Sequence, residues 1–284
     1  MNYRHIYHAG NICDVVKHAA LTLLLEHLRE KEKPFCVVDT HAGIGLYDLQ
    51  SEEAGKTAEA QAGIYHFLSA LPLPQLQNYY AVLEKINPGW KPGDDASGFR
   101  YYPGSPMIIT QMLRPDDRLV ACELHEEDFR TLRYRFYNVP QAQIHHRDGY
   151  EALRAFLPPT EKRGLVLIDP PFEDPDEFDK LAASLIEACK RWPQGQFVVW
   201  YPIKERPAIW RFHEVLAAAG LPKMLYAEFV YEEELRHDRL NGCGLLLINA
   251  PWQMDEKLSA LFPALHEAMN TSHRGSYVKE LTGS

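Results

Sequence analysis

The 284-residue sequence has few cysteines and no long apolar run. The five cysteines, at positions 13, 36, 122, 189 and 243, are odd in number and scattered, so they predict neither a disulfide framework nor a Cys-x-x-Cys metal site. No apolar run approaches the length of a membrane span, and the N-terminus is unlike a signal peptide. We therefore expect a protein of the reducing cytoplasm that does not enter a membrane.

Motifs for several other chemistries are also missing. His5 with His8, and His145 with His146, have no carboxylate or cysteine partner at metal-ligand spacing, and there is no His-Glu-x-x-His. Neither a Gly-x-Ser-x-Gly elbow nor a phosphate-binding P-loop is present. The full Gly-x-Gly-x-x-Gly pattern is absent as well, which leaves a nicotinamide-dependent oxidoreductase weakly supported. We expect no metal ion.

An excess of positive charge is missing too, because the formal net charge is −9 and the isoelectric point is about 5.8. This balance argues against a general nucleic-acid coat, although net charge does not describe a local site. Basic residues gather in two places, at Arg4, His5, His8, Lys17 and His18, and at Lys204, Arg206 and Arg211. Taken alone, each cluster favours a solvated face.

The sequence does contain an alternation of helical and strand patterns. Apolar residues recur at helical spacing over 11–31, and a buried strand is expected at 35–39. Further strands are expected near 118–123, 142–148, 164–169 and 196–202, with helices at 126–137, 149–156, 176–191 and 206–219. This order predicts an α/β fold with a doubly wound sheet.

Two segments depart from this alternation. Residues 53–98 indicate helices followed by a loop, and we interpret them as a small helical insertion within a single domain that spans 1–284. Residues 223–252 contain two strand-like runs joined by a polar segment that ends in Asn241-Gly242, a hairpin signal. A Rossmann-like sheet closed by an antiparallel hairpin is typical of the class I methyltransferase fold.

Acidic residues close four of the expected strands. They are Asp39, Glu123, Asp148 and Asp169, and a glycine-containing turn, Thr40 to Gly45, follows the first of them. Glu123 could accept both ribose hydroxyls of a nucleoside, and Asp148 could accept from an adenine amino group. Each of these two could instead cap a helix. The recurrence at one sheet edge, where open α/β sheets bind ligands, favours a binding site.

The stretch GLVLIDPPFEDP, residues 164–175, ends a buried strand on an acid, two prolines and a ring. Proline cannot extend a strand ladder, and it holds the preceding residue extended, so the chain leaves the sheet in a stiff conformation. The Asp169 carboxylate and the Pro170 carbonyl could each accept one N–H of an adenine amino group. Phe172 could stack on a base that has left its helix. By contrast, INAPW at 248–252 follows the last strand-like run and is interpreted as a strand exit.

Asp169-Pro170-Pro171-Phe172 matches the (Asp/Asn)-Pro-Pro-aromatic signature of S-adenosylmethionine-dependent methyltransferases that act on adenine N6. The segments YRHIYHAGNICDVVKH, DTHAGIG, YYPGSP, ELH, RDG, LIDPPF and WYPI together resemble the bacterial RlmJ family, almost end to end. Two departures are Phe172, where the family commonly has tyrosine, and Ala250, where it has proline. That family methylates N6 of an adenine in 23S ribosomal RNA.

The resemblance implies a role for particular positions. It implies that S-adenosylmethionine contacts His18, His41, Ser105, Glu123, Asp148, Gly149 and Asp169. It also implies that Asp169, the catalytic residue, serves both the cofactor and the target amine, and that Tyr3 touches the RNA. Pro170 and Phe172 are the other residues expected to contact the RNA. We expect a monomer that methylates 23S ribosomal RNA. The alternatives are a DNA adenine-N6 methyltransferase and a catalytically silent RNA-binding module on the same fold.

Overall fold

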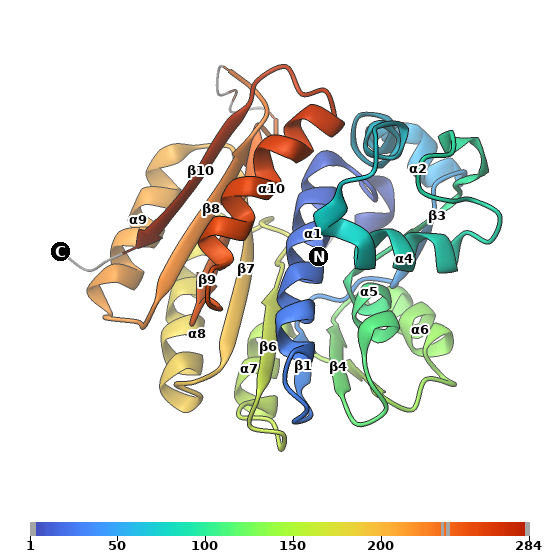
Figure 1. Cartoon of the computed structure of the whole chain (residues 1–284). Coiled ribbons are helices and arrows are strands. Elements are labelled where there is room, and N and C mark those ends of the chain that lie inside the picture. Colours follow the sequence, from blue (N-terminus) through green and yellow to red (C-terminus); the bar gives the residue numbers. More distant parts are fainter. Residues whose placement is uncertain (1–3, 234–235, 237–238, 282–284) are drawn as a thin grey trace.

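A computed structural model describes residues 4–233, 236 and 239–281. Eight strands form one sheet in the order β10-β8-β9-β7-β6-β1-β4-β5 (Figure 1). Their bounds are β1 Cys36–Asp39, β4 Arg118–Glu123, β5 Ala142–His146, β6 Gly164–Ile168, β7 Gln196–Ile203, β8 Met224–Val230, β9 Gly242–Ile248 and β10 Gly275–Leu281. Strands β5, β4, β1, β6 and β7 are parallel, while β9 is antiparallel to both β7 and β8. The expected doubly wound sheet with an antiparallel hairpin is confirmed.

Helices cover both faces of this sheet. The longer ones are α1 Ile12–Arg29, α5 Ser105–Met112, α6 Glu126–Arg135, α7 Gly149–Phe156, α8 Glu177–Arg191, α9 Arg206–Ala218 and α10 Met254–Ala268. One apolar cluster lies between the sheet and α1, α5 and α10, and a second lies between the sheet and α7, α8 and α9 (Figure 1). Successive residues of β1 and β6 alternate between the two clusters, which is why these strands are apolar throughout.

The segment between β1 and β4 carries a second, smaller sheet. Strands β2 Leu46–Asp48 and β3 Tyr101–Pro103 pair antiparallel, and the sequence predicted neither. Between them lie the helices α2 Glu52–Thr57, α3 His66–Ser69 and α4 Gln77–Ile86, with short helical turns at Gln61–Tyr65, Pro74–Leu76 and Ala96–Gly98. Another short turn, His5–Tyr7, precedes α1. We continue to treat 53–98 as an insertion in a single domain.

The C-terminal part contains two elements that the sequence did not predict. Helix α10 follows β9, and β10 then pairs antiparallel with β8 at the sheet edge. The exit of β9 lies beside Phe197, at the start of β7, and Asn249 donates from its amide to the carbonyls of Pro193 and Gly195. Residues 248–252 therefore lie at the sheet edge opposite Asp169, which confirms their interpretation as a strand exit.

Candidate functional site

A single cavity of about 1300 Å³ runs along the sheet edge at which the parallel strands end. Its wall includes every residue that the sequence assigned to a site and that the structure describes: His18, His41, Ser105, Glu123, Asp148, Gly149, Asp169, Pro170 and Phe172. Tyr3 lies outside the described residues. Residues up to 154 positions apart in the chain, from His18 to Phe172, are therefore brought together by the fold.

Glu123 ends β4 with its carboxylate fixed by two backbone amides. The amide of Gly43 donates to Oε2 and the amide of His125 donates to Oε1, each at 2.8 Å. The residue is 6% exposed, and burial raises the pKa of its carboxyl group. Because each carboxylate oxygen can accept more than one hydrogen bond, Glu123 can still bind two hydroxyl groups in the cavity.

Asp148 follows β5 and caps α7. Its Oδ1 accepts from the amides of Tyr150 and Glu151, so the capping role considered from the sequence is confirmed. Because both amides bond Oδ1, Oδ2 is available to a ligand. The next residue, Gly149, lies so close to His41 that a Cβ atom would meet its ring at 2.5 Å. Only glycine lets the α7 backbone approach the cavity wall this closely.

His41 is held as a neutral hydrogen-bond acceptor. The Thr40 hydroxyl donates to the carbonyl of Leu167 at 3.0 Å and lies 2.8 Å from Nδ1 of His41. Since its own hydrogen is engaged, this hydroxyl accepts from Nδ1–H, which leaves Nε2 of His41 as an acceptor. Burial lowers the pKa of His41 to about 4, consistent with a neutral ring at physiological pH.

His18 lies deeper, on α1. Its Nδ1 lies 2.7 Å from the hydroxyl of Tyr102, and its Nε2 is buried without a hydrogen-bond partner among the described residues. Burial, and then the charge of Lys17, hold the pKa of His18 well below its usual value. An unpaired buried nitrogen costs free energy, so Nε2 is suited to a polar group of a ligand.

Asp39 differs from the other strand-end acids because it does not line the cavity. It is fully buried. Burial raises the pKa of Asp39 to about 7. The cavity wall near it is instead formed by Ser105, which is 7% exposed at the start of α5.

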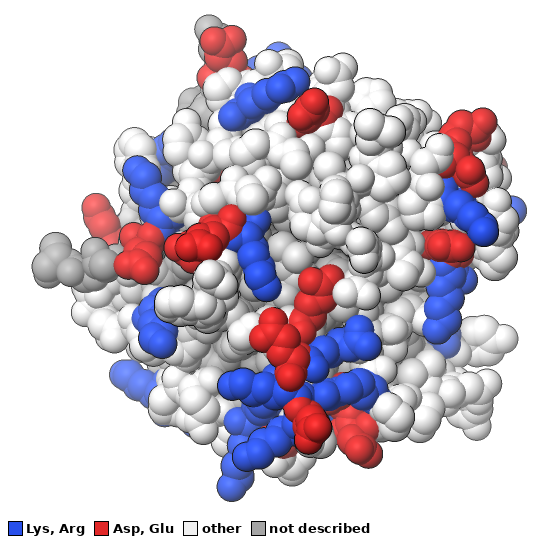
Figure 2. All heavy atoms as spheres, in the orientation of Figure 1, with Lys and Arg blue, Asp and Glu red and all other residues white. Residues whose placement is uncertain are grey.

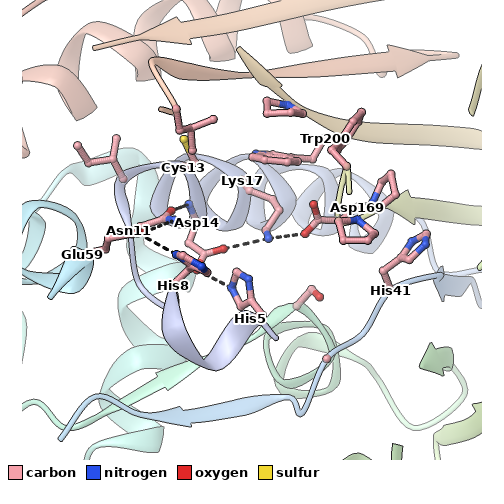
Figure 3. Close-up of a pocket in the computed structure, with 18 of the residues that line it drawn as sticks. His5, His8, Asn11, Cys13, Asp14, Lys17, His41, Glu59, Asp169 and Trp200 are labelled. Carbon is pink, nitrogen blue, oxygen red and sulfur yellow. Dashed lines mark hydrogen bonds and ion pairs between the residues drawn. The ribbon is translucent and has the colours of Figure 1, made fainter. Parts of the chain in front are cut away.

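Asp169 forms a buried ion pair that the sequence did not predict. Its Oδ2 accepts from Nζ of Lys17 at 2.5 Å, and the same ammonium lies 3.0 Å from Oδ1 of Asp14 (Figure 3). Asp14 in turn contacts Nε2 of His5 at 2.8 Å. The hydrogen bond from Lys17 fixes Oδ2 of Asp169 and leaves Oδ1 for another partner.

The positive charge of Lys17 and the negative charges of Asp14 and Asp169 stabilise each other. Burial alone would lower the pKa of Lys17, but Asp14 and Asp169 outweigh it and hold that pKa well above its usual value. Lys17 and His18 are 6% and 1% exposed, so the solvated face expected for the N-terminal basic cluster is wrong. The missed signal is that the apolar residues of 12–29 are not confined to one face of α1, so the polar residues between them are buried and paired.

Two aromatic rings line the cavity next to Asp169. Phe172 is half-buried, with its ring centroid 4.9 Å from that of Phe178 and 6.0 Å from that of Trp200. Trp200 lies on β7 and also packs 6.0 Å from Nζ of Lys17. Phe172 has a φ of +50°, which is strained for a residue with a side chain and typical of functional turns.

The donor set does not indicate a metal centre. Within the described part of the chain, no three His, Cys, Asp or Glu side chains are grouped to hold a metal ion. Over the same residues, no helix has the length and apolarity needed to cross a bilayer. The cavity does fit a nucleoside with a charged tail. It combines the acceptor oxygens of Glu123, the unpaired Nε2 of His18 and the backbone of Gly149, which lies close to the cavity wall because it has no Cβ atom.

Comparison with known proteins gives concordant matches. A family model described as "Ribosomal RNA large subunit methyltransferase D, RlmJ" matches residues 32–282. The ribosomal RNA large subunit methyltransferase J of Escherichia coli (strain K12) is 37% identical over 270 residues, covering 95% of this chain and 94% of that protein. The protein of the same name from Haemophilus influenzae is 36% identical over 281 residues, covering 99% and 98%.

A solved structure agrees over almost the whole length. The crystal structure of protein LPL1258 from Legionella pneumophila superposes with a TM-score of 0.85 at 32% identity. The match covers 96% of this chain and 98% of that chain.

Proposed function

The chain belongs to the RlmJ family of ribosomal RNA large subunit methyltransferases, and from this premise we propose that it methylates N6 of an adenine in 23S ribosomal RNA with S-adenosylmethionine. The observation that carries the proposal is the placement of Asp169. Its carboxylate lies at the end of β6, between the polar wall formed by β1, β4 and β5 and the ring of Trp200 on β7.

The polar wall is suited to the cofactor. Glu123 would accept the ribose hydroxyls, and Oδ2 of Asp148 would accept from the adenine amino group. His41 and His18, both neutral, would bind polar groups of the amino-acid tail, with Ser105 and Asp169 beside them. When bound, S-adenosylmethionine supplies an electrophilic methyl group on a positively charged sulfur.

Asp169 and Pro170 would bind the amino group that receives the methyl. This nitrogen is a weak nucleophile because its lone pair is delocalised into the adenine ring. With Lys17 on Oδ2, Oδ1 of Asp169 can accept one N–H, and the Pro170 carbonyl can accept the other. These bonds favour a pyramidal nitrogen and align it for in-line attack. Asp169 then accepts the proton that the nitrogen loses as the new N–C bond forms.

The aromatic pair next to Asp169 would hold the base. A target adenine must leave its stack before its amino group can reach the cavity. Phe172 offers a ring face at the cavity wall, and Trp200 lies 6.0 Å from it between ring centroids. Base–aromatic stacking contributes roughly 1–3 kcal/mol per base. The contact of Tyr3 with the RNA stays a prediction.

The test is methylation of three substrates with radiolabelled S-adenosylmethionine. We expect label in transcribed 23S ribosomal RNA and, by mass spectrometry, N6-methyladenine at one position. Label in duplex DNA but not in RNA would contradict the proposal and favour a DNA methyltransferase. RNA binding without labelled product would favour a catalytically silent module. Asp169→Ala serves as the matched inactive control.

Three further properties extend the proposal. The substrate places the protein in the cytoplasm, where ribosomes are assembled. The cavity wall is complete within one chain, so we propose that a monomer is active. Light scattering would give the mass of the protein under assay conditions. A specific activity that rises with protein concentration would instead indicate an obligate dimer. The family's chemistry and the donor set require no metal, and full activity after treatment with a chelator would agree with that.

A further inference from the structure

The cavity is larger than the cofactor and one base require. Pockets that hold a single small ligand span about 300–1,000 Å³, whereas this cavity measures about 1300 Å³. The residues assigned above lie at the ends of β5, β4, β1 and β6, on α1 and at the start of α5, with Trp200 on β7. The cavity continues past them to Tyr231 and Leu240, next to the ends of β8 and β9, and to Met269 at the end of α10. This second part has no occupant in the proposed reaction.

The wall of the second part contains an oriented carboxylate. Oε1 of Glu59 lies 2.8 Å from Nδ1 of His8, and Oε2 accepts from the Asn11 amide at 3.1 Å (Figure 3). The hydrogen bond with Glu59 raises the pKa of His8. Two donors therefore fix the plane of the carboxylate, and each oxygen keeps a lone pair for a ligand.

Other groups in this part are also hydrogen-bond acceptors. Nδ1 of His66 lies 3.2 Å from the carbonyl of Met269, so it donates there and the ring can accept through Nε2. The hydroxyl of Ser272 donates to the carbonyl of Tyr231, which leaves its oxygen as an acceptor. A ligand that presents several N–H donors can therefore bind these acceptors.

A free cation lies where the two parts of the cavity meet. Lys204 follows β7, two residues after Pro202, and both line the cavity. Its side chain is exposed, and no ion pair or hydrogen bond joins it to another residue in the described ranges. An exposed ammonium in this position can bind a phosphate of an RNA strand.

The described residues of the visible surface form no broad basic patch that would attract RNA by charge alone. On the face drawn in Figure 2, Lys and Arg side chains lie beside Asp and Glu side chains. On this face the two signs of charge are interspersed, so it does not form a uniformly basic surface for RNA. Groups inside the cavity can supply selectivity for an RNA site.

We propose that the second part of the cavity binds a nucleotide next to the target adenine, and that Glu59 recognises its base as guanine. This inference rests on the proposed function and adds a second recognised base. Guanine alone among the four bases has two adjacent N–H donors on its Watson–Crick edge, N1–H and N2–H, which match the two oxygens of a carboxylate. Single-stranded RNA is commonly read on this edge. Lys204 binds the phosphate between the two nucleotides.

The test compares Glu59→Gln and Lys204→Ala on transcribed RNA in which each neighbour of the mapped adenine is changed to all four bases. For the wild type we expect guanine to be preferred at one neighbouring position by about 5- to 150-fold in kcat/KM. Glu59→Gln should abolish this preference and leave cofactor affinity unchanged. Lys204→Ala should weaken all RNAs equally and reduce the salt dependence of binding, by about 0.7 in the log–log slope.

Matched controls are Glu52→Gln, an exposed residue at the start of α2, and Lys190→Ala, an exposed residue near the end of α8. Neither lines the cavity, so both should behave as the wild type. A wild type without preference at any neighbour, or an unchanged preference in Glu59→Gln, would overturn the inference. An equal loss of kcat/KM on all RNAs together with a lower melting temperature would also overturn it. In that case Glu59 would only stabilise the fold by linking His8 and Asn11.

Binding of the same RNAs by fluorescence anisotropy separates this inference from the proposed function. If no RNA is methylated, the proposed function fails. The guanine preference in binding, and its loss in Glu59→Gln, then decide the second site independently.

Discussion

Replacing Lys17 with methionine should lower the free energy of unfolding by about 3–5 kcal/mol near neutral pH. Lys17 is 6% exposed and is the shared counterion of Asp14 and Asp169, at 3.0 and 2.5 Å. Methionine keeps most of the apolar stem. The cost therefore comes from leaving two carboxylates, one of them 2% exposed, without their counterion.

The pH dependence of this loss follows from two pKa shifts. Burial raises the pKa of Asp14, but the charges of His5 and Lys17 outweigh it and hold that pKa well below its usual value. A depressed carboxyl pKa contributes stability above the unfolded value of about 3.9, and this is lost as the pH falls through the folded pKa. The raised pKa of Lys17 contributes stability below about 10.4, which is lost as the pH rises further. The loss should be constant between about pH 5 and 9 and smaller in acid.

Urea unfolding at several pH values, followed by circular dichroism, measures this loss. Lys190→Met, an exposed position on α8, is the control and should change stability by less than about 0.5 kcal/mol. If Lys17→Met cost less than about 1 kcal/mol at pH 7, Lys17 would behave as a solvated residue. That result would refute the buried ion pair.

Substitutions at three other positions test separate residues of the protein. Glu123→Gln should weaken S-adenosylmethionine binding by about 10- to 100-fold in calorimetry, since a charged hydrogen bond contributes about 1.5–3 kcal/mol; an unchanged dissociation constant would remove Glu123 from the cofactor site. Phe172→Tyr should change RNA methylation little, whereas Phe172→Ala should reduce kcat/KM by about 5- to 150-fold; a lower melting temperature without a selective RNA defect would make the ring a packing residue instead. Because the pKa of Asp39 is raised to about 7, the free energy of unfolding of the wild type should fall as the pH rises from about 4 to 7. In urea unfolding, Asp39→Asn should flatten this dependence on pH, and an identical dependence would show that Asp39 does not titrate there.

Most of the main sheet was predictable because its strands are buried on both faces. Strands β1, β4 and β6 are continuous apolar runs, and the helices between them have clear periodicity. Strand β10 was missed because it is an edge strand with exposed charges, and Pro263 interrupts the pattern of α10. Strands β2 and β3 have three residues each, too few for a periodic signal.

The candidate site was only partly predictable, for a different reason. The strand-end acids follow from strand order, so Glu123, Asp148 and Asp169 could be placed at one edge of the sheet. Lys17 could not, because its partner Asp169 lies 152 positions away and only the packing of α1 on the sheet joins them. Asp39 shows the converse, since a strand-end acid can face the core instead of the cavity.

Asp169 is proposed to bind the target amine and to accept its proton, and a single-turnover methylation rate tests this role. With saturating S-adenosylmethionine and 23S ribosomal RNA, Asp169→Ala should transfer the methyl group at least about 100-fold more slowly than the wild type. Melting temperature and circular dichroism should show a folded protein. A folded Asp169→Ala variant that keeps its rate within about tenfold of the wild type would contradict the account.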